Sequence, residues 1–196
     1  MTTIVVVKRD GQIAIAGDSL VTFGDTRLAS GYEQNEKIFK VADSYVGIAG
    51  TVAHFPVLRK ALRELPAADL RLGSREDVYS TFQKLHPILK DSFFLNSKEE
   101  DSDPYESSQL TCVIANATGI YGVYSYREVF AFERFWGIGS GRSFALGAMF
   151  TAWDTKAATA KSIAEIGVKA GIEFDKNSGM PYQLLTIEPE KKPRKK

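Results

Sequence analysis

Two kinds of hydrophobic spacing divide the chain into blocks of strands and blocks of helices. Continuous β-branched or apolar runs occupy residues 4–8 and 12–16, separated by Arg9, Asp10 and Gly11. Turn-forming residues between two such runs predict a β-hairpin at the start of the chain. Runs of the same kind predict the remaining strands, at 37–41, 45–49, 110–115, 119–125, 129–132 and 182–187.

Four other segments repeat apolar residues at the spacing of an amphipathic helix. The first covers 51–65 and is expected to stop at Pro66. The second is expected to begin after Ser74, whose hydroxyl can cap the helix, and to be kinked or ended by Pro87. The last two helices are expected at 143–154 and 159–174.

The order of these segments is strands, two helices, strands, two helices and a final strand. Blocks of strands, in place of strict alternation with helices, favour antiparallel sheets with the helices outside them. We therefore predict an α+β protein, a four-layer αββα sandwich of two antiparallel sheets between helical layers. Residues 1–188 are expected to form a single domain, with an exposed acidic loop at 96–108 and a basic, disordered tail at 189–196.

Composition excludes several functional classes. The formal net charge is +1, which favours neither nucleic acid nor an anionic membrane as a partner. Cys112 is the single cysteine and is expected to be a buried core thiol, and only two histidines are present. The sequence thus predicts no disulfide framework, no metal site and no cofactor. It shows no signal peptide and no membrane span, so a cytoplasmic location is expected.

The first candidate for chemistry is the dipeptide Met1–Thr2. Methionine before a small residue is readily removed, which would leave Thr2 with a free α-amine. An α-amine has a pKa of about 7.7–8.0, so it can act as a base for the hydroxyl of the same residue. Many cytoplasmic proteins begin with these two residues, so the dipeptide alone does not distinguish a nucleophile from an ordinary N-terminus.

The residues that follow resemble the start of the HslV and proteasome β-subunit family. The matching stretches are 2–7 and 11–18. The resemblance implies an N-terminal nucleophile hydrolase fold with Thr2 at the mouth of a cleft, and Asp18 holding Lys37 near it. An ammonium there would favour an alkoxide-like transition state. Without the resemblance, Asp18 is a turn residue and Lys37 a solvated charge. The segment between them is longer than in the family, which leaves Lys40 as a less favoured alternative.

Further motifs match the family in sequence order. Gly50, between a strand and a helix, corresponds to the glycine whose N–H forms the oxyanion hole. Thr22 corresponds to a residue whose backbone binds substrate as an added strand. The substrate pocket implied by the resemblance is expected to be apolar and to be lined by Val21, Phe39, Ile48 and Val52. Taken alone, the segment around Gly50 is an ordinary strand-to-helix turn.

Two turns complete the resemblance. Ser140, in a Gly-Ser-Gly turn, is implied to bind near the threonine amine, and Asp175 and Ser178 match a signature that completes the same network. Alone, the glycine-rich turn also suggests a nucleotide site. It lacks the Lys-Ser/Thr of a P-loop, and Arg142 stands where a dinucleotide fingerprint has its third glycine, so that reading is disfavoured.

The resemblance implies a threonine-type endopeptidase that acts on polypeptides from within stacked homo-oligomeric rings, with a AAA+ unfoldase as a further partner. Neither nucleic acid nor membrane is expected as a partner. Two alternatives stay open at this point. One is a catalytically silent, ring-forming scaffold subunit. The other is an N-terminal nucleophile amidohydrolase that acts on small amides.

Overall fold

The strands form two antiparallel sheets. The computed structural model describes residues 2–33, 35–98 and 102–188. β1 (Ile4–Arg9) and β2 (Gln12–Asp18) make the predicted hairpin, whose two turn residues both have positive φ, 50° at Asp10 and 78° at Gly11. That combination is typical of the type I′ turn, whose twist suits a hairpin. β10 (Phe135–Ile138) pairs with β1 and β11 (Tyr182–Ile187) with β2, which gives the order β10-β1-β2-β11.

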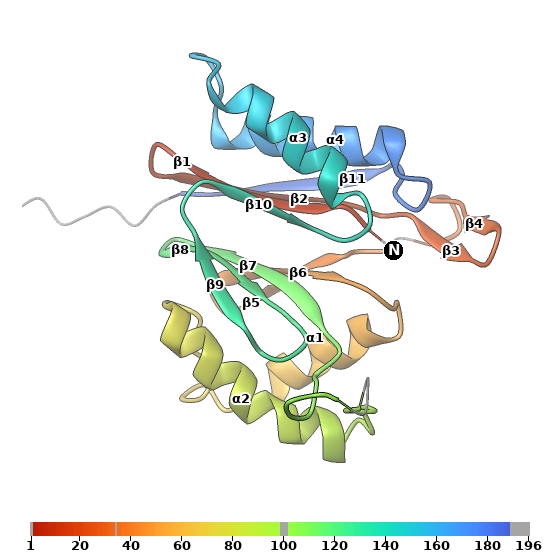
Figure 1. Cartoon of the computed structure of the whole chain (residues 1–196), viewed down its shortest axis with the longest axis vertical. Coiled ribbons are helices and arrows are strands. Elements are labelled where there is room, and N and C mark those ends of the chain that lie inside the picture. Colours follow the sequence, from red (N-terminus) through yellow and green to blue (C-terminus); the bar gives the residue numbers. More distant parts are fainter. Residues whose placement is uncertain (1, 34, 99–101, 189–196) are drawn as a thin grey trace, which may run out of the picture.

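The second sheet is a five-stranded meander in sequence order. Its strands are β5 (Ile38–Val41), β6 (Ser44–Ala49), β7 (Thr111–Asn116), β8 (Gly119–Val123) and β9 (Val129–Phe132). A separate short ribbon, β3 (Val21–Phe23) with β4 (Thr26–Leu28), follows β2. In Figure 1 this ribbon extends from the four-stranded sheet on the side where the chain begins.

Helices cover the outer face of each sheet (Figure 1). α1 (His54–Glu64) and α2 (Arg75–Asp91) pack on the five-stranded sheet, and α3 (Arg142–Trp153) and α4 (Ala160–Phe174) pack on the four-stranded sheet. Ser74 caps α2 as predicted, because its side chain accepts a hydrogen bond from the Asp77 N–H. The predicted α+β four-layer sandwich is confirmed.

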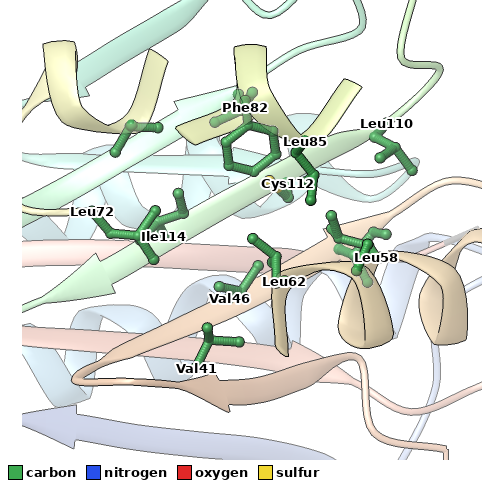
Figure 2. Packing of buried hydrophobic residues seen from close by; sticks show 14 of the residues in the cluster. Val41, Val46, Leu58, Leu62, Leu72, Phe82, Leu85, Leu110, Cys112 and Ile114 are labelled. Atoms are coloured by element: carbon green, nitrogen blue, oxygen red, sulfur yellow. The ribbon is translucent and has the colours of Figure 1, made fainter. Parts of the chain in front are cut away.

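Three hydrophobic layers hold this sandwich together. Along β1, Ile4 and Val6 face the other sheet, while Val5 and Val7 face α3 and α4. The third layer lies between the five-stranded sheet and α1 and α2, where Phe82 and Leu62 pack toward the strands (Figure 2). Cys112 is fully buried there, as predicted. β1 therefore carries apolar side chains on both faces, which fixes its position between two of these hydrophobic layers.

Two local expectations need correction. α2 continues through Pro87 to Asp91, so of the two effects expected of the proline, ending the helix is contradicted. Pro87 is exposed, while Leu85 and Leu89 on the buried face keep the helix on the sheet. β10 was not expected; it is short, contains Gly137, and runs directly into the Gly-Ser-Gly turn.

The predicted loop at 96–108 is not exposed throughout. Ser107 and Ser108 are buried, and residues 99–101 lie outside the described part of the chain. The tail predicted at 189–196 lies outside it as well. No helix within the described ranges is long and apolar enough to cross a membrane.

Candidate active site

The first two described residues lie at the head of β1 and are fully buried. The Thr3 N–H donates to Asp18 Oδ1 at 2.9 Å, and the Asp18 N–H donates to the Thr3 carbonyl at 3.1 Å. These two bonds continue the β1–β2 pairing by one residue. They hold Thr2 and Thr3 in an extended backbone beside the end of β2.

Asp18 and Lys37 form a buried ion pair. Lys37 Nζ lies 2.9 Å from Asp18 Oδ1, and the two side chains are 1% and 0% exposed. Because Thr3 N–H and Lys37 Nζ bind the same carboxylate oxygen, the ammonium lies within two hydrogen-bond lengths of the head of β1. The other oxygen, Oδ2, accepts from the N–H groups of Leu20 and Gly179. Four donors therefore surround this carboxylate and fix its orientation.

The charge of Lys37 depends on this arrangement. Burial lowers the pKa of Lys37 below its ordinary value, and the carboxylates of Asp18 and Asp175 oppose that shift. Lys37 immediately precedes β5, and its carbonyl accepts a hydrogen bond from the Ile48 N–H at 3.0 Å. The sheet thus fixes the backbone of the lysine while Asp18 fixes its side chain.

A second polar network reaches the same threonines from the opposite end of the chain. Ser140 Oγ accepts from the Thr2 N–H at 3.2 Å and donates to Asp175 Oδ2 at 2.6 Å. Ser178 Oγ lies 2.7 Å from both Asp175 Oδ2 and Thr3 Oγ1. Since the ionised carboxylate can only accept, Ser178 donates its hydrogen bond to Asp175 and accepts one from the Thr3 hydroxyl.

Asp175 anchors this second network as an anion. Its burial opposes ionisation, but hydrogen bonds from Ser140, Ser178 and Asn177 outweigh that effect and hold the pKa of Asp175 below its ordinary value. The carboxylate therefore remains charged near neutral pH and orients the Ser140 hydroxyl. The oxygen of Ser140 is left facing the Thr2 nitrogen.

The glycines around Ser140 allow the turn to approach the threonines closely. A Cβ on Gly139, whose φ is +91°, would lie 2.0 Å from the Thr2 carbonyl oxygen, and a Cβ on Gly141 would lie 1.9 Å from Thr3 Oγ1. The Gly141 N–H also donates to the Thr2 carbonyl at 3.3 Å. This turn packs against the start of β1, which accounts for its glycines without a phosphate.

Gly50 is exposed at the end of β6, has a φ of +120°, and has no atom within 4 Å of the position of a Cβ. Backbone in this conformation, open on one side, can present an N–H to a ligand. The predicted pocket residues lie in different environments. Val52 is exposed, whereas Phe39 and Ile48 are buried in the core layer under α1 and α2.

The remaining two predicted binding residues belong to the β3–β4 ribbon. Val21 is buried, and Thr22, partly exposed, is in register with Arg27 of β4. Lys40, the less favoured alternative to Lys37, is exposed on β5.

Two surface pockets adjoin the site. One, of about 360 Å³, is lined by Asp18 and Lys37 together with Ser19 and Tyr182. The other, of about 630 Å³, is lined by Glu33, Asn35, Glu36 and Val52 and by residues of α1. No cluster of three or more metal-ligating side chains occurs among the described residues.

A family model described as proteasome subunit matches residues 1–187. The chain belongs to the proteasome subunit family. Among solved structures, Thiobacillus denitrificans BPH is similar at a TM-score of 0.86 and 36% identity, over 95% of this chain and 97% of that one. The same protein in complex with epoxomicin is similar at a TM-score of 0.87 and 35% identity, over 96% of this chain and 100% of that one.

A more distant likeness, to eukaryotic HslV from Trypanosoma brucei, has a TM-score of 0.68 and 19% identity, over 95% of this chain and 99% of that one, and concerns the fold alone. No curated protein matches the sequence at a significant level.

Sequence reasoning missed part of the network in this proteasome-family subunit. Thr3 contributes its amide to Asp18 and its hydroxyl to Ser178, and the backbone of Leu20 and Gly179 completes the Asp18 shell. A polar residue opening an otherwise apolar buried strand was the one signal for Thr3. Backbone donors give no sequence signal, because every residue except proline carries one.

Proposed function

We propose that this chain is a threonine peptidase subunit whose nucleophile, Thr2, becomes active when Met1 is removed. The observation that carries the proposal is the single oxygen of Asp18 that binds both the Thr3 N–H and the buried Lys37 ammonium. It places a cation, shielded from water, beside the head of β1. A fixed positive charge in such a place stabilises negative charge that develops on a nearby hydroxyl.

In the proposed reaction, the freed α-amine of Thr2 takes the hydroxyl proton, directly or through one water, as Oγ attacks the peptide carbonyl. The N–H of Gly50 stabilises the tetrahedral oxyanion. The C–N bond then breaks, the leaving amine takes the proton, and an ester to Thr2 remains until water hydrolyses it.

The surrounding residues position these groups. Ser140 already accepts from the Thr2 nitrogen, and Asp175 orients the Ser140 hydroxyl. Lys37 supplies charge, and Asp18 holds Lys37 in place. Neither a metal nor a cofactor takes part in any step.

The proposed assembly is a stacked homo-oligomeric ring, in keeping with the proteasome family. Residues 1–188 would form one peptidase domain in each subunit. Rings arise when heterologous contacts between identical subunits close on themselves. A chamber formed in this way would confine the peptidase, in the cytoplasm, to polypeptides that can enter, and an AAA+ unfoldase is the corresponding partner. Light scattering on the purified protein tests the ring.

The chemical test begins with the mass of the purified protein, which we expect to lack one methionine residue. Epoxomicin, present in the complex of the 35% identical BPH, is the probe for the nucleophile. We expect the chain to gain the mass of one inhibitor at Thr2. The Thr2→Ser variant should still be labelled, because it keeps the amine and a hydroxyl. The Thr2→Ala variant should remain folded but unlabelled and inactive.

Other results would contradict the proposal in different ways. A chain that retains Met1 and does not react with epoxomicin would be a silent scaffold subunit. A chain that hydrolyses small amides but does not cleave long peptides would be an amidohydrolase. Full peptidase activity in the Thr2→Ala variant would exclude Thr2 as the nucleophile.

A further inference from the structure

Thr3 is a fully buried polar residue that directly follows the proposed nucleophile. The four residues after it, from Ile4 to Val7, are buried and apolar, so a valine would suit this position equally well by pattern. The bond from the Thr3 N–H to Asp18 needs only the backbone. The hydroxyl therefore calls for an explanation of its own, because burying a polar group costs free energy unless the group is hydrogen-bonded.

The fold leaves a narrow space for this side chain. A Cβ on Gly141, in the turn before α3, would lie 1.9 Å from Thr3 Oγ1. A Cβ on Gly171, within α4, would lie 2.3 Å from Thr3 Cγ2. Two glycines from separate elements thus enclose the side chain closely. A side chain packed in this way has little freedom to change rotamer, so its oxygen stays 2.7 Å from Ser178 Oγ.

The hydrogen bonds that begin at Thr3 run in one direction. Asp175 Oδ2 accepts from Ser178 at 2.7 Å and from Ser140 at 2.6 Å. The single proton of the Ser178 hydroxyl is used in its bond to the carboxylate, so the bond between Ser178 and Thr3 is donated by Thr3. The Thr3 hydroxyl therefore occupies the acceptor side of Ser178 and keeps the Ser178 proton directed at Asp175.

The orientation of Ser140 depends on the same carboxylate. The Ser140 proton has two acceptors within reach, Asp175 Oδ2 at 2.6 Å and the Thr2 carbonyl at 3.4 Å. Although burial opposes ionisation, hydrogen bonds from Ser140 and Ser178 hold the pKa of Asp175 below its ordinary value. A fixed anion favours the shorter bond, which leaves the Ser140 oxygen facing the Thr2 nitrogen, 3.2 Å away. A disturbance at Ser178 would therefore reach that nitrogen.

We propose that Thr3 is a positioning residue for the peptidase reaction and acts through its hydroxyl on Ser178. From there the effect passes through Asp175 and Ser140 to the amine of Thr2. This inference rests on the peptidase function proposed above and adds a residue to its machinery. Because Thr3 is fully buried, it touches no substrate, and its hydroxyl should affect the chemical step and not the binding of peptides.

Two variants separate the hydroxyl from the packing. Thr3→Val keeps the branched shape and removes the hydroxyl, so kcat for a fluorogenic peptide should fall about tenfold or more while KM changes little. Thr3→Ser keeps the hydroxyl and loses a methyl group, so it should retain most of the wild-type kcat. If Thr3 served packing alone, activity would follow the stability of the variants and not the presence of the hydroxyl.

A second comparison covers the case in which Thr3→Val is too large for the space and does not fold. Thr3→Ala and Thr3→Ser differ only in the hydroxyl, so kcat should again be about tenfold or more lower in Thr3→Ala. The matched control is Thr186→Val, which changes an exposed threonine of β11 in the same sheet and should keep the wild-type kcat.

A double-mutant cycle in kcat tests the route. If Thr3 acts through Ser178, adding Thr3→Val to Ser178→Ala should lower kcat little beyond the loss caused by Ser178→Ala alone. Losses in the two single variants that multiply in the double variant would overturn the route, because they would show that the two hydroxyls act independently.

Epoxomicin labelling separates this inference from the function on which it rests. After the intact mass has shown that Met1 is removed from each variant, Thr3→Val should still be labelled completely at Thr2, but more slowly than the wild type. Wild-type kcat in Thr3→Val or in Thr3→Ala would overturn the positioning role and leave the peptidase intact. Wild-type protein that neither reacts with epoxomicin nor cuts peptides would overturn both.

Discussion

The Asp18–Lys37 pair gives a prediction about stability that does not depend on activity. In Lys37→Met, a side chain of similar length removes the ammonium and leaves the fully buried Asp18 carboxylate without its counter-charge. Breaking a buried pair from one side costs about 3–5 kcal/mol. Three N–H groups, of Thr3, Leu20 and Gly179, would still bind the carboxylate. We therefore expect a loss near the lower limit, about 3 kcal/mol.

A double-mutant cycle tests the coupling between the two charges. Asp18→Asn alone should also destabilise, because it removes the carboxylate that lies 2.9 Å from the buried Lys37 ammonium. In the double variant neither position carries a charge, so its loss should be smaller than the sum of the two single losses by about 2 kcal/mol. The measurement is denaturant unfolding at one fixed protein concentration, since assembly would add to the apparent stability.

The control is Lys169→Met, which breaks an exposed ion pair with Glu165 on α4. It should change the free energy of unfolding by about 0.5 kcal/mol or less. Additive losses in the Asp18–Lys37 cycle, or a Lys37→Met loss no larger than that of the control, would refute the view that these two charges are desolvated partners.

Three further predictions concern other parts of the molecule. Gly141→Ala should destabilise by more than about 2 kcal/mol, because its Cβ would meet Thr3 Oγ1. Gly147→Ala on α3, where the space is open, should instead stabilise by about 0.5–1 kcal/mol. Equal denaturation midpoints for the two variants would contradict this. The pKa of Asp175 is lowered in the folded state, so its contribution to stability is present above the ordinary aspartate pKa and is lost as pH falls through the folded-state pKa. In Asp175→Asn, the free energy of unfolding should therefore fall less steeply at acid pH than in the wild type. An unchanged dependence on pH would argue against this. Burial raises the pKa of the Cys112 thiol, so native protein should not react with a thiol reagent until denaturant is added, and rapid labelling of folded protein would show that the layer under α2 opens readily.

Long, strongly patterned segments were predictable from the sequence. β1, β2, α2 and α4 were expected close to their observed positions, because each buries an apolar face at a regular spacing. The three-residue strands β3 and β4 carry too few positions for any period to appear. β10 was missed for another reason: Gly137 within it breaks the apolar run, and its strand conformation is supplied by pairing with β1.

For the site, side chains were easier to nominate than contacts. Thr2, Asp18, Lys37, Ser140, Asp175 and Ser178 were nominated from motifs, and the structure brings them into one hydrogen-bonded region. The inward direction of Phe39 and Ile48 depends on the alternation of β5 and β6, whose faces are set by the sheets on either side.

The hydrogen bond from the Gly179 N–H to Asp18 makes the proposed chemistry depend on a segment that is synthesised 161 residues after Asp18. Asp175, Ser178 and Gly179 are among the last of the described residues to leave the ribosome, yet they bind groups at positions 3, 18 and 140. A nascent chain that has reached only residue 170 has its threonine, its lysine and its first sheet strands, but not the turn that orients them. The proposed site would therefore stay unassembled until the turn at residues 175–179 has been made and has packed against the first strands.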